Sequence, residues 1–158
     1  MPLARLFPAL AVLFLAAAAA AQPLAPRPGW EVHTTAKPYE QLITGLKSAV
    51  KAQGLTVVTQ AGPTKAAAAR GITIPGNRVL GVFNNDYAVK VLAASTAAMI
   101  EAPVRFYVTE EEDGTATLSY KTPSHVFAPY MDEGGSALAD LARQLDADFA
   151  AIAAAATR

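Results

Sequence analysis

The stretch VRFYVTEEEDGTATLSYK, residues 104–121, decides the fold of this chain. In each half of the stretch, apolar side chains alternate with polar or amphipathic ones, which is the period of a half-buried strand. An Asp-Gly pair separates the halves, and this pair favours a tight turn between antiparallel strands. The stretch therefore predicts a β-hairpin with one apolar face. The alternating apolar positions are Val104, Phe106, Val108, Ala116, Leu118 and Tyr120.

Segments on both sides of the hairpin alternate between extended and helical patterns. The further strands expected from β-branched runs are residues 30–35, 55–60 and 78–83. The helices expected from apolar spacing and from Gly and Pro boundaries are residues 38–53, 63–70, 87–94 and 136–152. The resulting order, β-α-β-α-β-α-β-β-α, predicts an α+β fold. We expect a single mixed β-sheet with helices packed mainly on one face.

The first 21 residues are typical of a secretory signal peptide. Arg5 is their only charge, residues 6–21 are apolar, and Ala19-Ala20-Ala21 supplies the small residues that a signal peptidase needs. As a helix, residues 6–21 would reach roughly 24 Å, short of a bilayer core of about 30 Å, so a membrane anchor is the weaker interpretation. We expect cleavage near Ala21 and a periplasmic or secreted protein, with a Pro-rich leader at 22–29 and a single domain at 30–158.

Composition narrows the possible functions. The chain has no Cys, which excludes disulfides, thiolate metal sites and cysteine nucleophiles. Cleavage would remove one of the 13 Lys and Arg, namely Arg5, and leave all 13 Asp and Glu, so the mature net charge is −1. A nucleic-acid partner is not expected, because it would need a basic surface. Nor do we expect a membrane span after cleavage, or a cofactor.

Two stretches, RVLGVFNNDYAVKVL (78–92) and EAPVRFYVTEEEDGTATLSYKTP (101–123), resemble the bacterial domain-of-unknown-function family 302. The resemblance covers about residues 30–130 and implies a compact α+β fold that tends to dimerise. Members typically have an Asn-Pro turn and a Leu-Pro pair, where this chain has Asn84-Asn85-Asp86 and Ala102-Pro103. Cysteines of some members correspond to Phe83 and Arg105, so their thiol chemistry is absent here. The resemblance implies a fold rather than an activity.

His33 and His125 are the two histidines of the chain. With Met131, Asp132 or Glu133 they could hold a metal ion, since imidazole and thioether ligands suit copper. Their spacing is neither His-x-His nor His-x₃-His, so no single element prealigns them, and ordinary surface or core histidines are the competing interpretation. A metal-dependent or hydrolytic enzyme that uses His33 and His125 is the alternative function.

Asn84-Asn85-Asp86 lies where an expected strand meets an expected helix, and helix N-termini often bind anions. Asp86 would repel an anion, however, and these side chains can simply cap the helix. Together with Tyr87 and His125, the three residues are the candidates for a ligand site. The four acids from Glu110 to Asp113 could gather calcium, but a solvated turn that keeps the hairpin soluble is the favoured interpretation. Adjacent strand residues point to opposite faces, so the four acids cannot all converge on one ion.

Apolar surface is the remaining indication of function. The five tyrosines and the apolar stripe of residues 138–152 could line a pocket, bury against a second subunit, or complete the core. We therefore expect a non-catalytic binding or accessory protein for a small or apolar ligand. We expect it to be a homodimer, and no catalytic residue is assigned.

Overall fold

A five-stranded sheet organises the structure, a computed structural model that describes residues 24–158. The strands lie in the order β1-β5-β4-β3-β2, and all four neighbouring pairs are antiparallel. The strands are β1 (Trp30–Pro38), β2 (Thr56–Ala61), β3 (Asn77–Phe83), β4 (Val104–Glu110) and β5 (Thr115–Lys121). The signal peptide expected at 1–21 lies outside the described residues.

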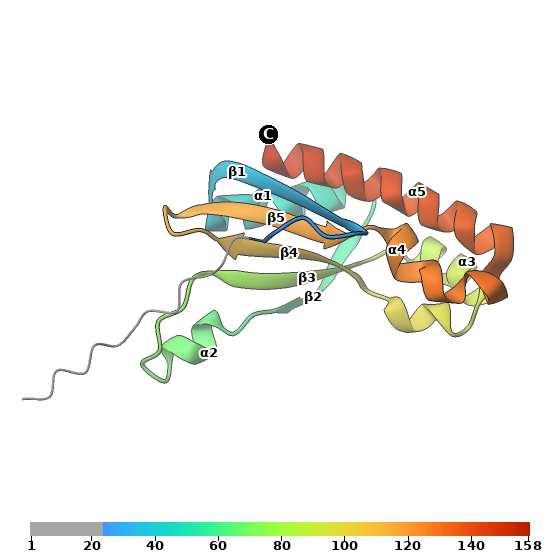
Figure 1. Ribbon diagram of the computed structural model, residues 1–158, viewed down its shortest axis with the longest axis horizontal. Coiled ribbons are helices and arrows are strands. Elements are labelled where there is room, and N and C mark those ends of the chain that lie inside the picture. The colour runs from blue at the N-terminus through green and yellow to red at the C-terminus, as the bar shows by residue number, and fades with distance from the viewer. Residues whose placement is uncertain (1–23) are drawn as a thin grey trace, which may run out of the picture.

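Within residues 24–158, five helices and two short 3₁₀ turns connect and cover the strands (Figure 1). The helices are α1 (Tyr39–Ala52), α2 (Thr64–Ala68), α3 (Asn85–Ala94), α4 (Pro123–Phe127) and α5 (Met131–Thr157), and the 3₁₀ turns are η1 (Ala98–Glu101) and η2 (Ala128–Tyr130). Gly135, at φ 55, breaks the regular geometry of α5. The long helical stretch after this break is the one that the apolar stripe predicts.

The α+β class, the single sheet, the hairpin and the element order are confirmed, with α4 added between β5 and α5. The sheet is antiparallel throughout the described strands and not mixed, which corrects the expected pairing. Two parallel neighbours need a crossover connection that returns the chain to the end of the sheet where the first strand began. Here the segments that hold α2 and α3 lead directly into antiparallel neighbours, so they act as reversals.

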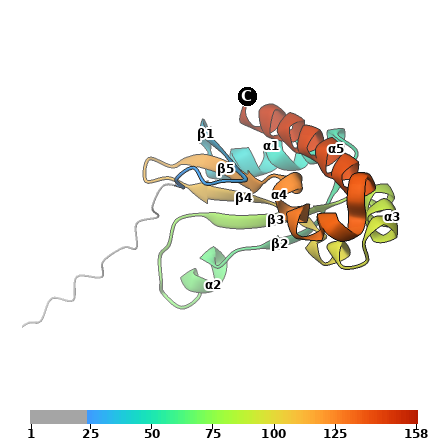
Figure 2. The same cartoon turned by 45° about the vertical axis from the view of Figure 1, so that its right-hand side comes forward.

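The face of the sheet that packs against α1 and α5 forms the core. Phe106 is fully buried and stacks on Phe149 of α5 at 4.4 Å between ring centroids. The rings of Tyr120 and Phe106 pack edge to face, with 5.2 Å between their centroids. Tyr120 also contacts Phe149, so β4, β5 and α5 share one aromatic cluster. Figure 2 shows α1 and α5 on the same side of the sheet. Other buried side chains of this layer are Leu42, Leu46, Leu80, Val108, Leu118, Leu138 and Ile152.

The opposite face, called here the open face, carries the residues that alternate with the core positions. Its side chains, read from the strand register, are Trp30, Val32, Thr34, Asn77, Val79, Arg105, Tyr107, Thr109, Thr117, Ser119 and Lys121. The described part of the leader, residues 24–29, runs along β5 before β1 begins at Trp30 (Figure 1). Leu24 lines a hollow with Thr34 and Thr117 there. None of the large helices of residues 24–158 covers this face in Figures 1 and 2.

None of the helices within residues 24–158 has the length and hydrophobicity that crossing a bilayer requires.

The aromatic cluster predicts a stability effect. Phe106→Ala should lower the free energy of unfolding by about 3–5 kcal/mol, because it empties space against Phe149 and Tyr120. Ile72→Ala is the control, since Ile72 is 50% exposed in the loop between α2 and β3, and it should change that energy by less than about 1 kcal/mol. Urea denaturation followed by circular dichroism measures both. Equal effects at the two positions would contradict this description of the core.

Candidate functional site

Asn84, the first residue of the expected ligand site, caps α3. Its side-chain Oδ1 accepts hydrogen bonds from the backbone N–H groups of Asp86 (2.9 Å) and Tyr87 (3.1 Å). Its Nδ2 donates to the backbone oxygen of Gly54 at 3.0 Å. The amide is therefore occupied within the protein, as in an ordinary N-cap. Asn85 and Asp86 are exposed in the first turn of the helix.

Tyr87 belongs to a hydrogen-bonded group that joins α3, α5 and the C-terminal end of α1. Its hydroxyl donates to Asp148 Oδ2 at 2.8 Å, and Gln53 Nε2 donates to the other oxygen of that carboxylate at 3.0 Å. Burial, followed by the hydrogen bond and charge of Asp148, raises the pKa of Tyr87 to about 12. The phenol thus remains protonated and serves as a donor that links α3 to α5.

The hollow beside Asn84 and Tyr87 is small. It is apolar, with about 40 Å³ of free space, whereas sites for small ligands usually have about 300–1,000 Å³. Its walls include Val91, Met99, Phe127 and Phe149, which belong to the core or pack against it. This corner of the fold accordingly has too little room for a ligand.

His125 does not join the residues around Asn84. It is exposed in the first turn of α4, where Thr122 Oγ1 accepts its backbone N–H at 3.3 Å. Its ring lies against Gly29, so closely that a Cβ at Gly29 would come within 2.2 Å of the ring. The hollow lined by Asn84 and Tyr87 does not include His125 among its described residues.

His33 lies in β1 on the face that meets the helices. Its ring stacks on Tyr120 at 6.0 Å, and its Nε2 is buried with no hydrogen-bond partner within the described chain. Among residues 24–158, no three His, Asp or Glu side chains gather closely enough to hold a metal ion. Glu133 instead accepts a hydrogen bond from Ser95 Oγ at 2.8 Å. Within the described residues, His33 and His125 therefore form no three-ligand group with Asp132 or Glu133.

The acidic side chains at the hairpin tip have different hydrogen-bond partners and do not point to one place. Glu110 Oε2 accepts the backbone N–H of Gly76 at 2.6 Å, and Asp113 Oδ1 accepts the backbone N–H of Thr115 at 2.9 Å. The hydrogen bonds of Thr115 also lower the pKa of Asp113. One acid thus fastens a neighbouring loop while another builds the turn, as expected for a structural tip.

A larger groove crosses the open face. Its volume is about 480 Å³, within the usual range of small-ligand sites. Val79 and Tyr107, neighbours on β3 and β4, lie side by side along it. The residues around them are Trp30, Asn77, Glu101, Val104, Arg105, Tyr120, Lys121 and Val126. Its walls are mostly apolar, so the groove suits a ligand that is mostly apolar.

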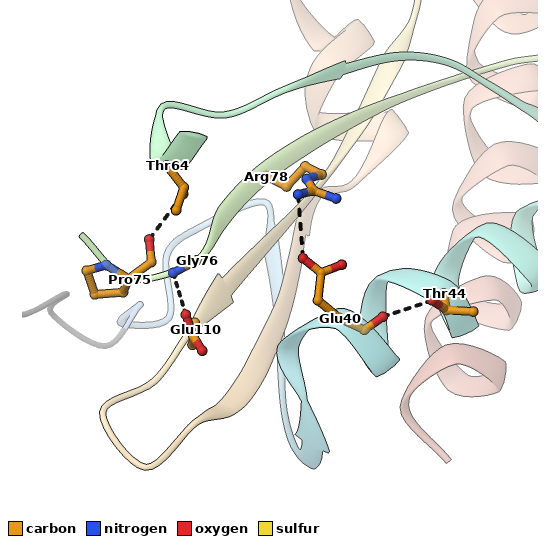
Figure 3. A network of polar contacts seen from close by, with 7 residues as sticks. All are labelled: Glu40, Thr44, Thr64, Pro75, Gly76, Arg78 and Glu110. Atoms are coloured by element: carbon orange, nitrogen blue, oxygen red, sulfur yellow. Dashed lines mark hydrogen bonds and ion pairs between the residues drawn. The ribbon is translucent and has the colours of Figure 1, made fainter. Parts of the chain in front are cut away.

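One end of the groove is held in place by polar contacts. Asn77 Nδ2 donates to the hydroxyl of Tyr107 at 2.5 Å. The two neighbours of Asn77 are also fixed, because Gly76 is bound by Glu110 and Arg78 lies 3.6 Å from Glu40 (Figure 3). Gly76 must be glycine here, since a Cβ would meet the ring of Tyr39 at 2.7 Å. The contacts of β3, the hairpin and α1 therefore preorganise this end.

Sequence reasoning placed none of the groove residues in its candidate ligand site, although Tyr107 and Tyr120 are among the five tyrosines that it allowed to line a pocket. Arg105 was recognised as a polar partner in the alternation of β4 and as the counterpart of a family cysteine. The sequence did carry one usable signal: the outward positions of the hairpin hold an aromatic ring and two cations, Tyr107, Arg105 and Lys121. Which other strands lie beside them depends on pairing that the sequence does not state.

Residues 30–156 match the family described as "Domain of unknown function DUF302", and the chain belongs to that family. The structure is similar to the crystal structure of an uncharacterized conserved DUF302 protein from Bacillus stearothermophilus. The two share 20% sequence identity, the TM-score is 0.71, and the match covers 82% of this chain and 98% of the other. This likeness shows the fold alone. Among curated proteins, no match to the chain was found.

The capping geometry predicts the effect of changing Asn84. Asn84→Ala should lower the free energy of unfolding by about 1 kcal/mol, because two backbone N–H groups lose their acceptor. Asn84→Asp keeps an acceptor and should lower it less, losing only the hydrogen bond to Gly54. Urea denaturation compares the two variants. An Asn84→Asp variant as unstable as Asn84→Ala would show that the cap is not the main contribution.

Proposed function

We propose that this domain is a non-catalytic binding or accessory protein that holds a small, largely apolar ligand in the open-face groove. The observation that carries this proposal is the groove itself, about 480 Å³ in volume with a predominantly apolar lining. Pockets that bind small molecules are typically concave and mostly apolar, with a few polar groups that fix orientation. Asn77, Tyr107, Arg105 and Lys121 are such polar groups.

The side chains of the groove suit binding better than catalysis. Among the described residues that line it, the one carboxylate is Glu101, which accepts a hydrogen bond from Tyr130 at 2.7 Å. Glu101 also lies 4.0 Å from Arg105, so its charge is partly compensated. Neither histidine lines the groove within the described chain. A nucleophile paired with a base would be the mark of an enzyme, and these side chains offer no such pair.

The proposal includes export and self-association. The apolar N-terminus with its Ala-Ala-Ala exit supports export to the periplasm or the medium after cleavage near Ala21. A homodimer is supported by large apolar side chains left exposed on neighbouring elements, since Val89 and Leu92 on α3 and Ile100 on η1 are 61%, 50% and 79% exposed. Exposed apolar patches often mark protein interfaces.

Binding in the groove is testable with a neutral fluorescent probe, N-phenylnaphthylamine. Val79→Gln should weaken its binding roughly tenfold, because the change removes apolar contact from the groove. Val58→Gln is the matched control, since Val58 is 50% exposed on β2 and lies outside the groove, and it should leave the affinity within about twofold. Fluorescence titration measures both. Equal loss in the two variants, or no binding by the unchanged protein, would refute the groove as the site.

Export and dimerisation are testable by native mass spectrometry of the precursor expressed with its own N-terminus in a bacterium that has a periplasm. We expect a dimer of chains that begin at Gln22 in the periplasm or the medium. Leu92→Glu combined with Ile100→Glu should yield monomers, because charges would then enter the apolar patch. A mature wild-type monomer would contradict self-association, and uncleaved protein in the cytoplasm would contradict export.

A further inference from the structure

Two cations, Arg105 and Lys121, line one end of the open-face groove, and a third, Arg27, lies against the Trp30 ring. On one side of β5, the register pairs Lys121 with Trp30 of β1. On the other side, Phe106 pairs with Tyr120, so Lys121 lies beside Arg105 of β4 when the register is continued by one residue. Lys121 Nζ lies 5.7 Å from the centre of the Trp30 ring, and the Arg27 guanidinium lies 5.5 Å from it. Trp30, Arg105 and Lys121 all line the groove.

This arrangement of like charges has a cost, since cations on directly opposite residues of neighbouring strands repel one another. The surrounding carboxylates compensate only part of it. Glu101 lies 4.0 Å from Arg105, but it also accepts a hydrogen bond from Tyr130. Glu31 pairs with Tyr120 in the register and therefore points to the other face of the sheet, and Asp146 accepts hydrogen bonds from Ser124. The groove end keeps an excess of positive charge.

An anion is the natural partner for this end. Arg105 has a 62% exposed side chain, so its guanidinium remains accessible to a ligand. Guanidinium and ammonium groups form charge-assisted hydrogen bonds with carboxylates, which are stronger than hydrogen bonds between neutral groups. The groove then continues from this end over Val79 and Tyr107 to Asn77. From Arg105 to Thr109 opposite Asn77, four residues of strand span roughly 13 Å.

We propose that the groove selects an amphiphile with one anionic head, such as a medium-chain carboxylate. Arg105 and Lys121 bind the head, and Val79 and Tyr107 contact the apolar chain. This inference rests on the proposed function, because it names the class of ligand for the same groove. It goes further in assigning a direction, with the head at the end of the sheet where Trp30 lies and the tail toward Asn77.

The test compares decanoate with decanol, which have the same chain length and differ in the charge of the head. Each is titrated against the protein loaded with N-phenylnaphthylamine, and displacement of the probe gives its affinity. We expect decanoate to bind roughly tenfold more tightly than decanol, because hydrogen bonds to charged groups are worth more than those between neutral groups. The preference should shrink as the salt concentration rises, since salt screens exposed charges.

The double variant Arg105→Gln with Lys121→Gln should reduce this preference to less than about twofold, while the affinity for decanol stays the same. The matched control is Lys90→Gln with Arg143→Gln, which removes two cations outside the groove and should keep the full preference. Circular dichroism checks that both variants fold. We expect the double variant to fold at least as well as wild type, because it removes the repulsion between neighbouring strands.

The outcomes separate this inference from the proposed function. If the probe binds and the two amphiphiles displace it equally, the anionic head is wrong and the groove remains a binding site. If the probe does not bind, the proposed function itself is wrong. A second copy of the chain could instead cover the open face, in which case decanoate binding would weaken as the protein concentration rises. That result would also overturn the amphiphile.

Discussion

The packing of Phe106 against Phe149 is the contact on which the rest of the structure depends. It joins β4, near the middle of the sheet, to α5, and Tyr120 brings β5 into the same cluster. Once Phe106 faces the helices, the alternation of a strand forces its neighbours Arg105 and Tyr107 onto the other face. The antiparallel register then carries that choice to every strand. The groove on the open face is therefore a geometric consequence of how the core is filled.

Many polar side chains that look chemically capable are used to join elements. Asn84 caps α3, Tyr87 donates to Asp148, and Asp146 accepts the backbone N–H of Ser124 at the start of α4 (2.9 Å). Each satisfies a group at a helix end or between helices, where unpaired donors would be costly. Their partners lie within the chain, so these residues explain how the layer of helices is fixed. They leave the open face as the place where side chains have room for a ligand.

The open face places like charges and aromatic rings side by side. Arg105 and Lys121 are placed as neighbours despite their repulsion, and Tyr107 and Trp30 expose aromatic surface beside them. Local stability alone would favour opposite charges at such positions. A ligand that brings its own negative charge and apolar body would offset both costs. The leader along β5 adds a cation, Arg27, to the same end of the face.

The sequence by itself determined the class, the order of elements and the hairpin, because hydrophobic periodicity and turn residues such as Asp113-Gly114 act over a few positions. The sequence also allowed two interpretations of Asn84, a helix cap and a ligand-site residue. It could not decide that the sheet is antiparallel throughout, nor place Trp30 and Lys121 beside Arg105, since these are separated by many residues along the chain. Only the tertiary structure decided this, because strand pairing is set by how all the apolar faces pack together at once. The candidate site depends on those long-range neighbours, which is why it lies away from Asn84 and His125.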